Sequence, residues 1–376
     1  MPKKLYFIGY LLLTFSSQAI WITFAPVVSQ IAAEVGTTAT HIGMLAVLYP
    51  IFFLPLSLPA GRLIDSNLKK YVLLAVLLTA LSALGRFISQ DLVTLYFCQI
   101  LAAVAQPFVL NGFVPVAHTL FPAQRSRALS ALSVAMYSGM AFSLLTGVYL
   151  YERFGMYGLL WPSAITGLSG LVLIALTYKS IDYKPLHSKF HFSEIKTLMK
   201  SKPVLLLGCI LGLGVGTFDN LSTWLEPALQ HTEASTSAGS AMGMAILAGI
   251  FSVGPVVALV AKRGWHTQYL HFATLAVSMS MYLLSMHHPV WLIKGILIFG
   301  GSAMFPAYPI ILELVAERHS NVGLATGAVG MVSRVITVTL TVAAALFIAG
   351  PKMFFTYLSI PVLVGFFLIF FYEKTS

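Results

Sequence analysis

Charge is scarce in this chain. Asp, Glu, Lys and Arg make up 9% of its 376 residues, whereas a soluble domain carries charge at about a quarter of its positions. Hydrophobic residues supply 58% of the sequence, so no stretch has the composition of a sizeable domain that folds in water. A soluble enzyme is therefore excluded, and we expect a protein that folds within a membrane.

Cysteine is almost absent as well. The two cysteines, Cys98 and Cys209, both fall inside apolar runs, so the sequence predicts neither a disulfide framework nor a thiol metal site. The chain has no glycine-rich phosphate loop, which argues against ATP as the source of energy. No enzyme constellation is present either, and we expect no catalytic residues, no cofactor and no metal centre.

The sequence is dominated by long apolar runs. A run of about 20 residues crosses the ~30 Å hydrocarbon core of a bilayer, and turn residues or charges separate the runs of this chain from one another. The runs predict an all-α membrane protein with twelve transmembrane helices. They lie at residues 6–27, 42–63, 71–88, 92–120, 128–151, 158–178, 204–229, 238–261, 268–285, 290–315, 322–347 and 354–371.

The formal net charge of +10 is distributed unevenly between the loops. If the N-terminus is cytoplasmic, nearly all loop Lys and Arg lie on the inner side, and only Arg153 and Lys352 lie outside. This asymmetry follows the positive-inside rule, so both termini are predicted to be cytoplasmic. The basic excess is a topology signal and not a nucleic-acid footprint. We expect a multi-pass protein of the plasma membrane, the inner membrane in a bacterium.

The longest connection divides the chain into two sets of six spans. It is basic and contains a short amphipathic piece at residues 192–198, which suits the inner membrane surface. Prolines of the fourth span have counterparts in the tenth, at Pro107, Pro115, Pro306 and Pro309. We therefore predict an N-terminal six-helix bundle at 1–178, a cytoplasmic linker at 179–203 and a C-terminal six-helix bundle at 204–376.

The loop between the second and third spans carries a recognisable motif. Residues 61–70 read GRLIDSNLKK and resemble the signature G-x-x-x-D-R-x-G-R-K of the major facilitator superfamily, with departures at Ser66 and Leu68. Two six-span halves with Pro and Gly interruptions also describe that architecture. The resemblance implies a cytoplasmic gate, although a solvated turn with topogenic lysines is the alternative. The candidate gate residues are Asp65, Lys69, Lys70, Arg125, Arg127, Glu317 and Arg318.

Two motifs of drug/proton antiporters are missing. Gln99 stands where many of them have an Arg, and Gly139 and Gly147 only loosely match their G-x-x-x-G-P motif. Drug efflux is therefore disfavoured. We expect import of a small polar or charged organic solute by alternating access, either facilitated or coupled to protons as symport.

Within the superfamily, the chain most resembles the feline leukaemia virus subgroup C receptor family, which moves choline and has been linked to haem. The resemblance rests on the SQAIW, VAQPF and GTFDNLST segments at residues 17–21, 104–108 and 216–223. It implies that Trp21 and Gln106 line the pocket, and we add Ser17 and Gln18 from the same segment as Trp21. An aromatic face attracts a quaternary ammonium, which agrees with this assignment. An interfacial position is the alternative for Trp21.

Asp219 and Arg334 are opposite charges inside two apolar runs, and a charge at bilayer depth is costly unless it is paired or faces water. Asp219, Thr223 and Glu226 share one face of their helix at 100° per residue. Three interpretations stay open: a structural ion pair, a clasp for a zwitterion, or Asp219 as the proton carrier with Arg334 holding an anionic group. Both charges depart from the choline-transporting family, which leaves choline itself in question.

The remaining predictions concern cargo and partners. The cargo is choline-like, amino-acid-like or another zwitterion, and the alternative is an iron chelate, either haem or a ferric siderophore. Arg86 and Lys294 lie near the outer ends of their spans, and we expect them to snorkel to the surface. The expected partners are a small-molecule substrate, the lipid bilayer and, as coupling ions, protons. We expect no nucleic acid and a monomeric protein.

Overall fold

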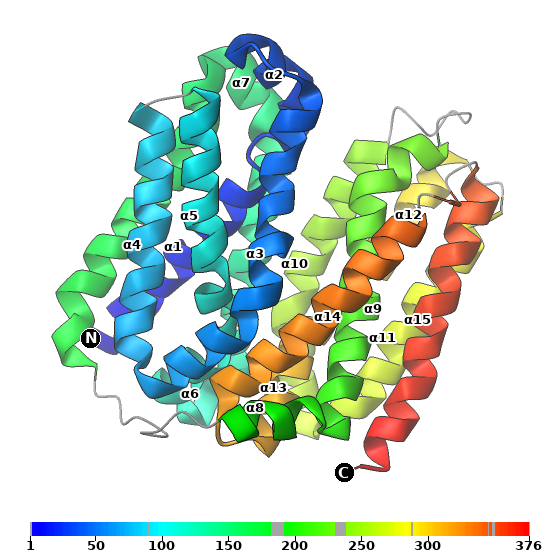
Figure 1. Ribbon diagram of the computed structural model, residues 1–376. Helices are drawn as coiled ribbons and strands as arrows, with labels where there is room; N and C mark the ends of the chain where they lie inside the picture. The colour runs from blue at the N-terminus through cyan, green and yellow to red at the C-terminus, as the bar shows by residue number, and fades with distance from the viewer. Residues whose placement is uncertain are drawn as a thin grey trace. The chain divides into compact units, whose positions relative to one another are not determined.

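The computed structural model describes residues 2–88, 91–181, 192–229, 238–286, 289–344, 346–347 and 350–375. Over this part the chain is nearly all helical and contains no strand, as Figure 1 shows. Ten helical stretches of the described chain are long and apolar enough to cross a membrane. The predicted class, an all-α membrane protein, is therefore confirmed.

Two further passes complete the predicted set of spans. Helix α7 (Arg125–Thr177) has 53 residues and contains two helices joined at Gly155, whose φ of 63° and ψ of −158° suit glycine. Helix α11 (His266–Leu284) is not among the ten apolar stretches, but it fills the predicted ninth run and packs against α12 and α15. With α7 counted twice and α11 added, the ten stretches become the twelve predicted passes.

The first compact unit comprises Met1–Phe190 together with His319–Gly327. Its helix α1 packs against α5 and α7, while α3 packs against α4 and α5. Gly139 of α7 permits one of these close contacts, because a Cβ there would lie 2.3 Å from the carbonyl oxygen of Phe15. The helices, besides α7, are α1 (Pro2–Ile22), α2 (Val28–Val35), α3 (Ala39–Ser66), α4 (Leu68–Ile88), α5 (Leu92–Asn111) and α6 (Phe113–Leu120).

The second compact unit comprises His191–Arg318 and Ala328–Ser376. Here α10 packs against α12, and α15 packs against α9 and α11. The first residues of α14 belong to the first unit and the rest to the second. The helices, besides α11, are α8 (Phe192–Met199), α9 (Lys202–Leu229), α10 (Ala238–Arg263), α12 (Val290–Met304), α13 (Ala307–Arg318), α14 (Val322–Ala344) and α15 (Pro351–Glu373).

Prolines interrupt the helical hydrogen bonding, and side chains of neighbouring helices take the free carbonyls. Pro50 lies inside α3 and has no N–H for the carbonyl of Ala46, which instead accepts a hydrogen bond of 2.9 Å from the Trp21 indole. In the second unit, Pro306 follows α12 and likewise frees the carbonyl of Ser302. The Ser252 hydroxyl of α10 donates to that oxygen at 2.8 Å.

The predicted linker lies partly outside the described residues. Residues 182–191 are not described, whereas the predicted amphipathic piece at 192–198 coincides with helix α8. The compact units do not follow the predicted bundles at every residue. The start of the predicted eleventh span groups with the first unit, although the prediction assigned it to the C-terminal bundle. The beginning of α14 lies next to the end of α3, where the motif of residues 61–70 begins.

Candidate functional site

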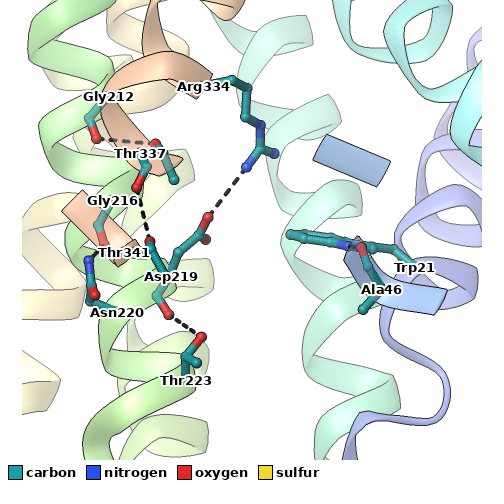
Figure 2. Close-up of polar contacts among 10 residues, drawn as sticks. All are labelled: Trp21, Ala46, Gly212, Gly216, Asp219, Asn220, Thr223, Arg334, Thr337 and Thr341. Carbon is teal, nitrogen blue, oxygen red and sulfur yellow. Dashed lines mark hydrogen bonds and ion pairs between the residues drawn. The ribbon is translucent and has the colours of Figure 1, made fainter. Parts of the chain in front are cut away.

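The second unit contains the ion pair that the sequence singled out. Nη1 of Arg334 on α14 lies 3.3 Å from Oδ2 of Asp219 on α9, and the two side chains are 12% and 20% exposed. Figure 2 shows the guanidinium and the carboxylate pointing toward each other. Asp219 makes this one side-chain contact within the described chain, so its Oδ1 oxygen stays available. The two side chains therefore form an ion pair through one contact, and both remain partly exposed.

Glycines on one face of α9 bring the two charges together. Gly208, Gly212 and Gly216 are four residues apart, and a Cβ on each would lie within 2.8 Å of a side chain on α14. The hydroxyl of Thr337 also donates to the carbonyl of Gly212 at 3.3 Å (Figure 2). Small residues let two membrane helices approach closely, and this approach places Asp219 one turn beyond Gly216 and opposite Arg334.

The other residues predicted to share the polar face of α9 with Asp219 form no ion pair in the described chain. Thr223 is exposed, and its hydroxyl donates to the backbone carbonyl of Asp219 at 2.7 Å. The backbone of Glu226 lies in α9, but its side chain lies outside the described part. Sequence reasoning missed Asn220, which is fully buried, donates to the carbonyl of Gly216 at 2.7 Å and leaves Oδ1 without a partner in the described chain.

In the first unit, three predicted pocket residues are buried and lack partners. Ser17, Gln18 and Gln106 are at most 2% exposed. Within the described chain, Ser17 Oγ, Gln18 Nε2 and both amide atoms of Gln106 have no hydrogen-bond partner. An unsatisfied buried polar group costs about 1–3 kcal/mol, so each of these groups favours a water or a solute beside it.

Trp21 packs within the first unit through its indole N–H group and its ring. Its indole N–H is committed to the carbonyl of Ala46 (Figure 2), and its ring stacks on that of Tyr49, with centroids 5.9 Å apart and an interplanar angle of 22°. The Tyr49 hydroxyl in turn donates to the carbonyl of Ser17 at 3.0 Å. The N–H group of Trp21 therefore serves the protein backbone, and its ring forms an aromatic pair with Tyr49.

Arg86 corrects an expectation. It does not snorkel, since it is 1% exposed and lies inside the first unit. Its Nη1 donates to the carbonyl of Ile20 and to Oε1 of Gln99, both at 3.2 Å, and its guanidinium lies 4.8 Å from the centroid of the Phe24 ring. A position near the end of a span suits a snorkelling and a buried arginine equally, so no pattern in the sequence indicates these tertiary partners.

The predicted gate residue Asp65 is bound to the start of α14. Its Oδ1 and Oδ2 accept hydrogen bonds of 2.8 Å from the backbone N–H groups of Gly323 and Leu324, and the side chain is fully buried. These N–H groups belong to the first turn of α14, where a carboxylate is favoured by the helix dipole. A side chain on Gly61 is excluded, because its Cβ would lie 2.3 Å from the carbonyl oxygen of Gly323.

Three other predicted gate residues contact aromatic rings inside their own units. Lys69 and Lys70 lie over the rings of Tyr178 and Tyr71, at 4.9 Å and 5.4 Å from the centroids. Arg318 belongs to the second unit and lies 4.3 Å from the Tyr372 ring centroid. The last three members are a half-buried Arg125 and the exposed Arg127 and Glu317.

Comparison with known proteins assigns the family. The model of the Major Facilitator Superfamily matches residues 10–341. An uncharacterised protein of Archaeoglobus fulgidus is 25% identical over 160 residues, covering 42% of this chain and 74% of the relative. Solute carrier family 49 member A3 of Xenopus tropicalis is 25% identical over 251 residues, covering 58% of this chain and 50% of the relative. The match thus spans about half the length of that carrier.

Solved structures share the fold across the whole chain. The human organic anion transporter MFSD10 superposes with a TM-score of 0.77 at 16% identity, covering 98% of each chain. A bacterial homologue of the iron transporter ferroportin gives 0.75 at 14% identity, covering 99% of each chain. The Escherichia coli fucose:proton symporter gives 0.71 at 13% identity, covering 97% of this chain and 98% of that one. At these identities the likeness concerns the fold alone.

Proposed function

This chain belongs to the major facilitator superfamily and is a multi-pass membrane transporter, and we propose that it imports a small polar organic solute by alternating access. The family fixes the class of activity, whereas the cargo and the direction are our proposal. Import is supported by the missing antiporter motifs, in particular by the neutral Gln99 at the position where drug antiporters carry a charge.

The observation that carries this proposal is the Asp219–Arg334 pair. The two charges lie in apolar helices, meet through a single 3.3 Å contact and keep partly exposed side chains. A purely structural pair in hydrocarbon would gain from a sealed, bidentate geometry. The open geometry supports a working pair, whose charges separate or change partners during the transport cycle.

Proton coupling is the mechanism that this geometry favours. A carboxylate held by one hydrogen bond, with its Oδ1 available, can take up a proton and release Arg334. Protonation removes the attraction between the two side chains, so it changes the relative stability of access states that differ in their separation. We therefore assign the coupling proton to Asp219, with symport as the mode of transport. The fold of a known fucose:proton symporter is compatible with this mode.

The cargo that we propose is an amino-acid-like or other zwitterion, or a choline-like cation. The first unit supplies polar groups without partners, Ser17 Oγ, Gln18 Nε2 and the amide of Gln106, together with the aromatic pair of Trp21 and Tyr49. Neutral amides orient polar groups, and an aromatic face attracts an ammonium group. The resemblance of residues 17–21 and 104–108 to a choline-transporting branch of the superfamily also supports this cargo class.

Asp65 is proposed as the cytoplasmic latch. Its two charged hydrogen bonds to Gly323 and Leu324 are worth about 1.5–3 kcal/mol each, and α14 continues from these residues into the second unit. Releasing the carboxylate would break both hydrogen bonds and take this acceptor from two N–H groups in the first turn of α14. The latch therefore stabilises one access state over the other by a few kcal/mol.

Uptake into proteoliposomes tests the proposal. Purified full-length protein is reconstituted, and uptake of radiolabelled zwitterions is measured with and without an inward proton gradient. We expect gradient-stimulated uptake that Asp219→Asn makes insensitive to the gradient. If uptake by the native protein does not depend on the gradient, proton coupling is refuted. Outward pumping of drugs would refute the proposed direction.

A further inference from the structure

Arg86 uses only part of its hydrogen-bonding capacity. A guanidinium has five N–H donors, and both contacts of this one are made by Nη1, to the carbonyl of Ile20 and to Oε1 of Gln99. Nε and Nη2 are shielded from solvent and have no partner in the described chain. These two nitrogens form one edge of the guanidinium, and their N–H groups point in parallel.

The charge of Arg86 is only partly compensated. No carboxylate of the described residues forms an ion pair with it, although a buried cation is costly unless it is paired. Its neighbours offer partial compensation, because Ile20 lies in the last turn of α1, where the helix dipole is negative, and the Phe24 ring faces the guanidinium. The contact with the last turn of α1 explains why Nη1 is buried there. It gives no reason for burying the Nε–Nη2 edge.

We propose that the Nε–Nη2 edge of Arg86 binds a carboxylate group of the transported solute. This inference rests on the proposed function and narrows its substrate class to carboxylate-bearing solutes. Two parallel N–H groups match the two oxygens of a carboxylate, which is the geometry of bidentate arginine recognition. A solute carboxylate would both neutralise the buried cation and satisfy its free donors.

Gln99 acts as a positioning residue in this site. Its Oε1 accepts from Arg86 Nη1 at 3.2 Å, while its Nε2 donates to the carbonyl of Trp21 at 3.4 Å. Both ends of the amide are thus engaged, which fixes its orientation and holds the guanidinium from one side. The free edge of Arg86 remains directed away from this contact.

Gln106 is a second, independent observation that points to a ligand. It is 1% exposed, and neither amide atom has a partner in the described chain. Gln99 and Gln106 lie seven residues apart on one face of α5, which corresponds to about 10 Å along a helix. A solute that contacts both the Nε–Nη2 edge of Arg86 and the amide of Gln106 would therefore carry a second hydrogen-bonding group besides its carboxylate.

Protein atoms cover the Nε–Nη2 edge in this conformation, since its two nitrogen atoms have almost no accessible surface. A bound carboxylate would therefore be occluded from water, and binding requires the unit to open first. Exclusion of water strengthens the interaction between the guanidinium and an anion. The site suits a step of the cycle in which the solute is enclosed.

Ligand-induced stabilisation of the purified full-length protein tests this site. Thermal unfolding is followed with acetate, succinate, glutarate and benzoate, with the neutral diamides of succinate and glutarate, and with sodium chloride. A ligand that binds only the folded state raises the apparent stability. We expect at least one carboxylate to stabilise the protein while its amide does not, and we expect Arg86→Gln to weaken that ligand at least tenfold.

Matched variants separate binding from folding. Arg86→Lys keeps the charge but loses the parallel N–H pair, so it should fold and still bind the carboxylate at least tenfold more weakly, whereas Arg153→Gln, at an exposed arginine, should bind normally. Equal stabilisation of the native protein and both Arg86 variants would overturn the proposal, as would stabilisation by chloride alone or by no anion. Carboxylate binding at Arg86 without any uptake would instead refute the proposed function and leave this site standing.

Discussion

Asp65 and Gly323 approach one another so closely that no side chain larger than hydrogen fits at position 323. A Cβ there would lie 2.7 Å from Oδ1 of Asp65 and 2.7 Å from the carbonyl oxygen of Gly61. The same carboxylate oxygen accepts the N–H of Gly323 at 2.8 Å. The contact thus combines a helix cap with a steric requirement, and each part can be tested separately.

Asp65→Asn should slow transport while leaving solute binding nearly unchanged. The amide can accept one hydrogen bond from the first turn of α14 but no longer carries the charge that favours this position. A loss of about 1.4 kcal/mol changes the ratio of the two access states tenfold. Uptake rates in proteoliposomes and ligand affinity by calorimetry check this, and parallel loss of both would show that Asp65 is needed for folding.

Gly323→Ala should impair transport more than Asp65→Asn does. The added methyl group meets Asp65 and the backbone of Gly61, so α3 and the start of α14 must move apart. Gly295→Ala is the matched control, because a Cβ at that α12 position meets nothing within 4 Å. We expect the control to transport normally. Equal uptake by Gly323→Ala and the control would refute the steric requirement.

The Asp219–Arg334 pair is tested by a double-mutant cycle. If the two side chains do no more than neutralise each other, Asp219→Asn combined with Arg334→Gln should restore much of the transport that either change removes. We expect the double mutant to remain inactive, because the proposed cycle uses the protonatable carboxylate itself. Uptake is compared at equal amounts of folded protein, and rescue by the double mutant would assign the pair a structural role.

Changes at Trp21 separate its two contacts. Trp21→Phe keeps an aromatic ring beside Tyr49 but removes the donor to the carbonyl of Ala46, so it should lower stability by about 1 kcal/mol with little change in affinity. Trp21→Ala removes the ring and should weaken solute binding at least tenfold. Calorimetric affinities decide between them, and unchanged affinity in the alanine variant would remove Trp21 from the site.

Gln106→Ala addresses the unpartnered amide directly. Its two polar atoms make no hydrogen bond within the described chain, so the substitution removes no protein hydrogen bond and costs the empty protein only the packing of the buried side chain. Solute affinity should fall about tenfold, since the loss of one hydrogen bond to a buried polar group costs roughly 1–1.5 kcal/mol. A thermal-unfolding curve without ligand is the control, and a large loss of stability there would contradict this account.

Much of the fold could be predicted because hydropathy has a direct cause. A bilayer demands about 20 apolar residues per helix, and the structure confirms the helical spans, including the turn between the fifth and sixth at Gly155. The sequence singled out Asp219 and Arg334, because opposite charges in hydrocarbon must be paired or face water, but it left open whether they contact each other, as the structure shows, or the cargo.

The wrong expectation for Arg86 has an equally physical origin. Depth along a span was estimated from the sequence, but the direction of a side chain depends on which helices surround it. Phe24, Ile20 and Gln99 surround Arg86 in the folded unit, and they belong to segments whose packing no periodicity reveals. The hydrogen bonds of Asp65 to backbone N–H groups of Gly323 and Leu324 were hidden for the same reason.

The hydrogen bond from Ser252 to the carbonyl of Ser302 has a mechanical consequence. A proline break in a membrane helix offers a hinge when its free carbonyl has no fixed donor. At Pro306 this carbonyl accepts from the Ser252 hydroxyl of α10, which also lies 2.8 Å from the carbonyl of Gly249, so bending there would separate the Ser302 carbonyl from its donor in a medium that offers no water to replace it. The junction of α12 and α13 is therefore expected to resist bending. The conformational change of transport must then bend the chain at another place.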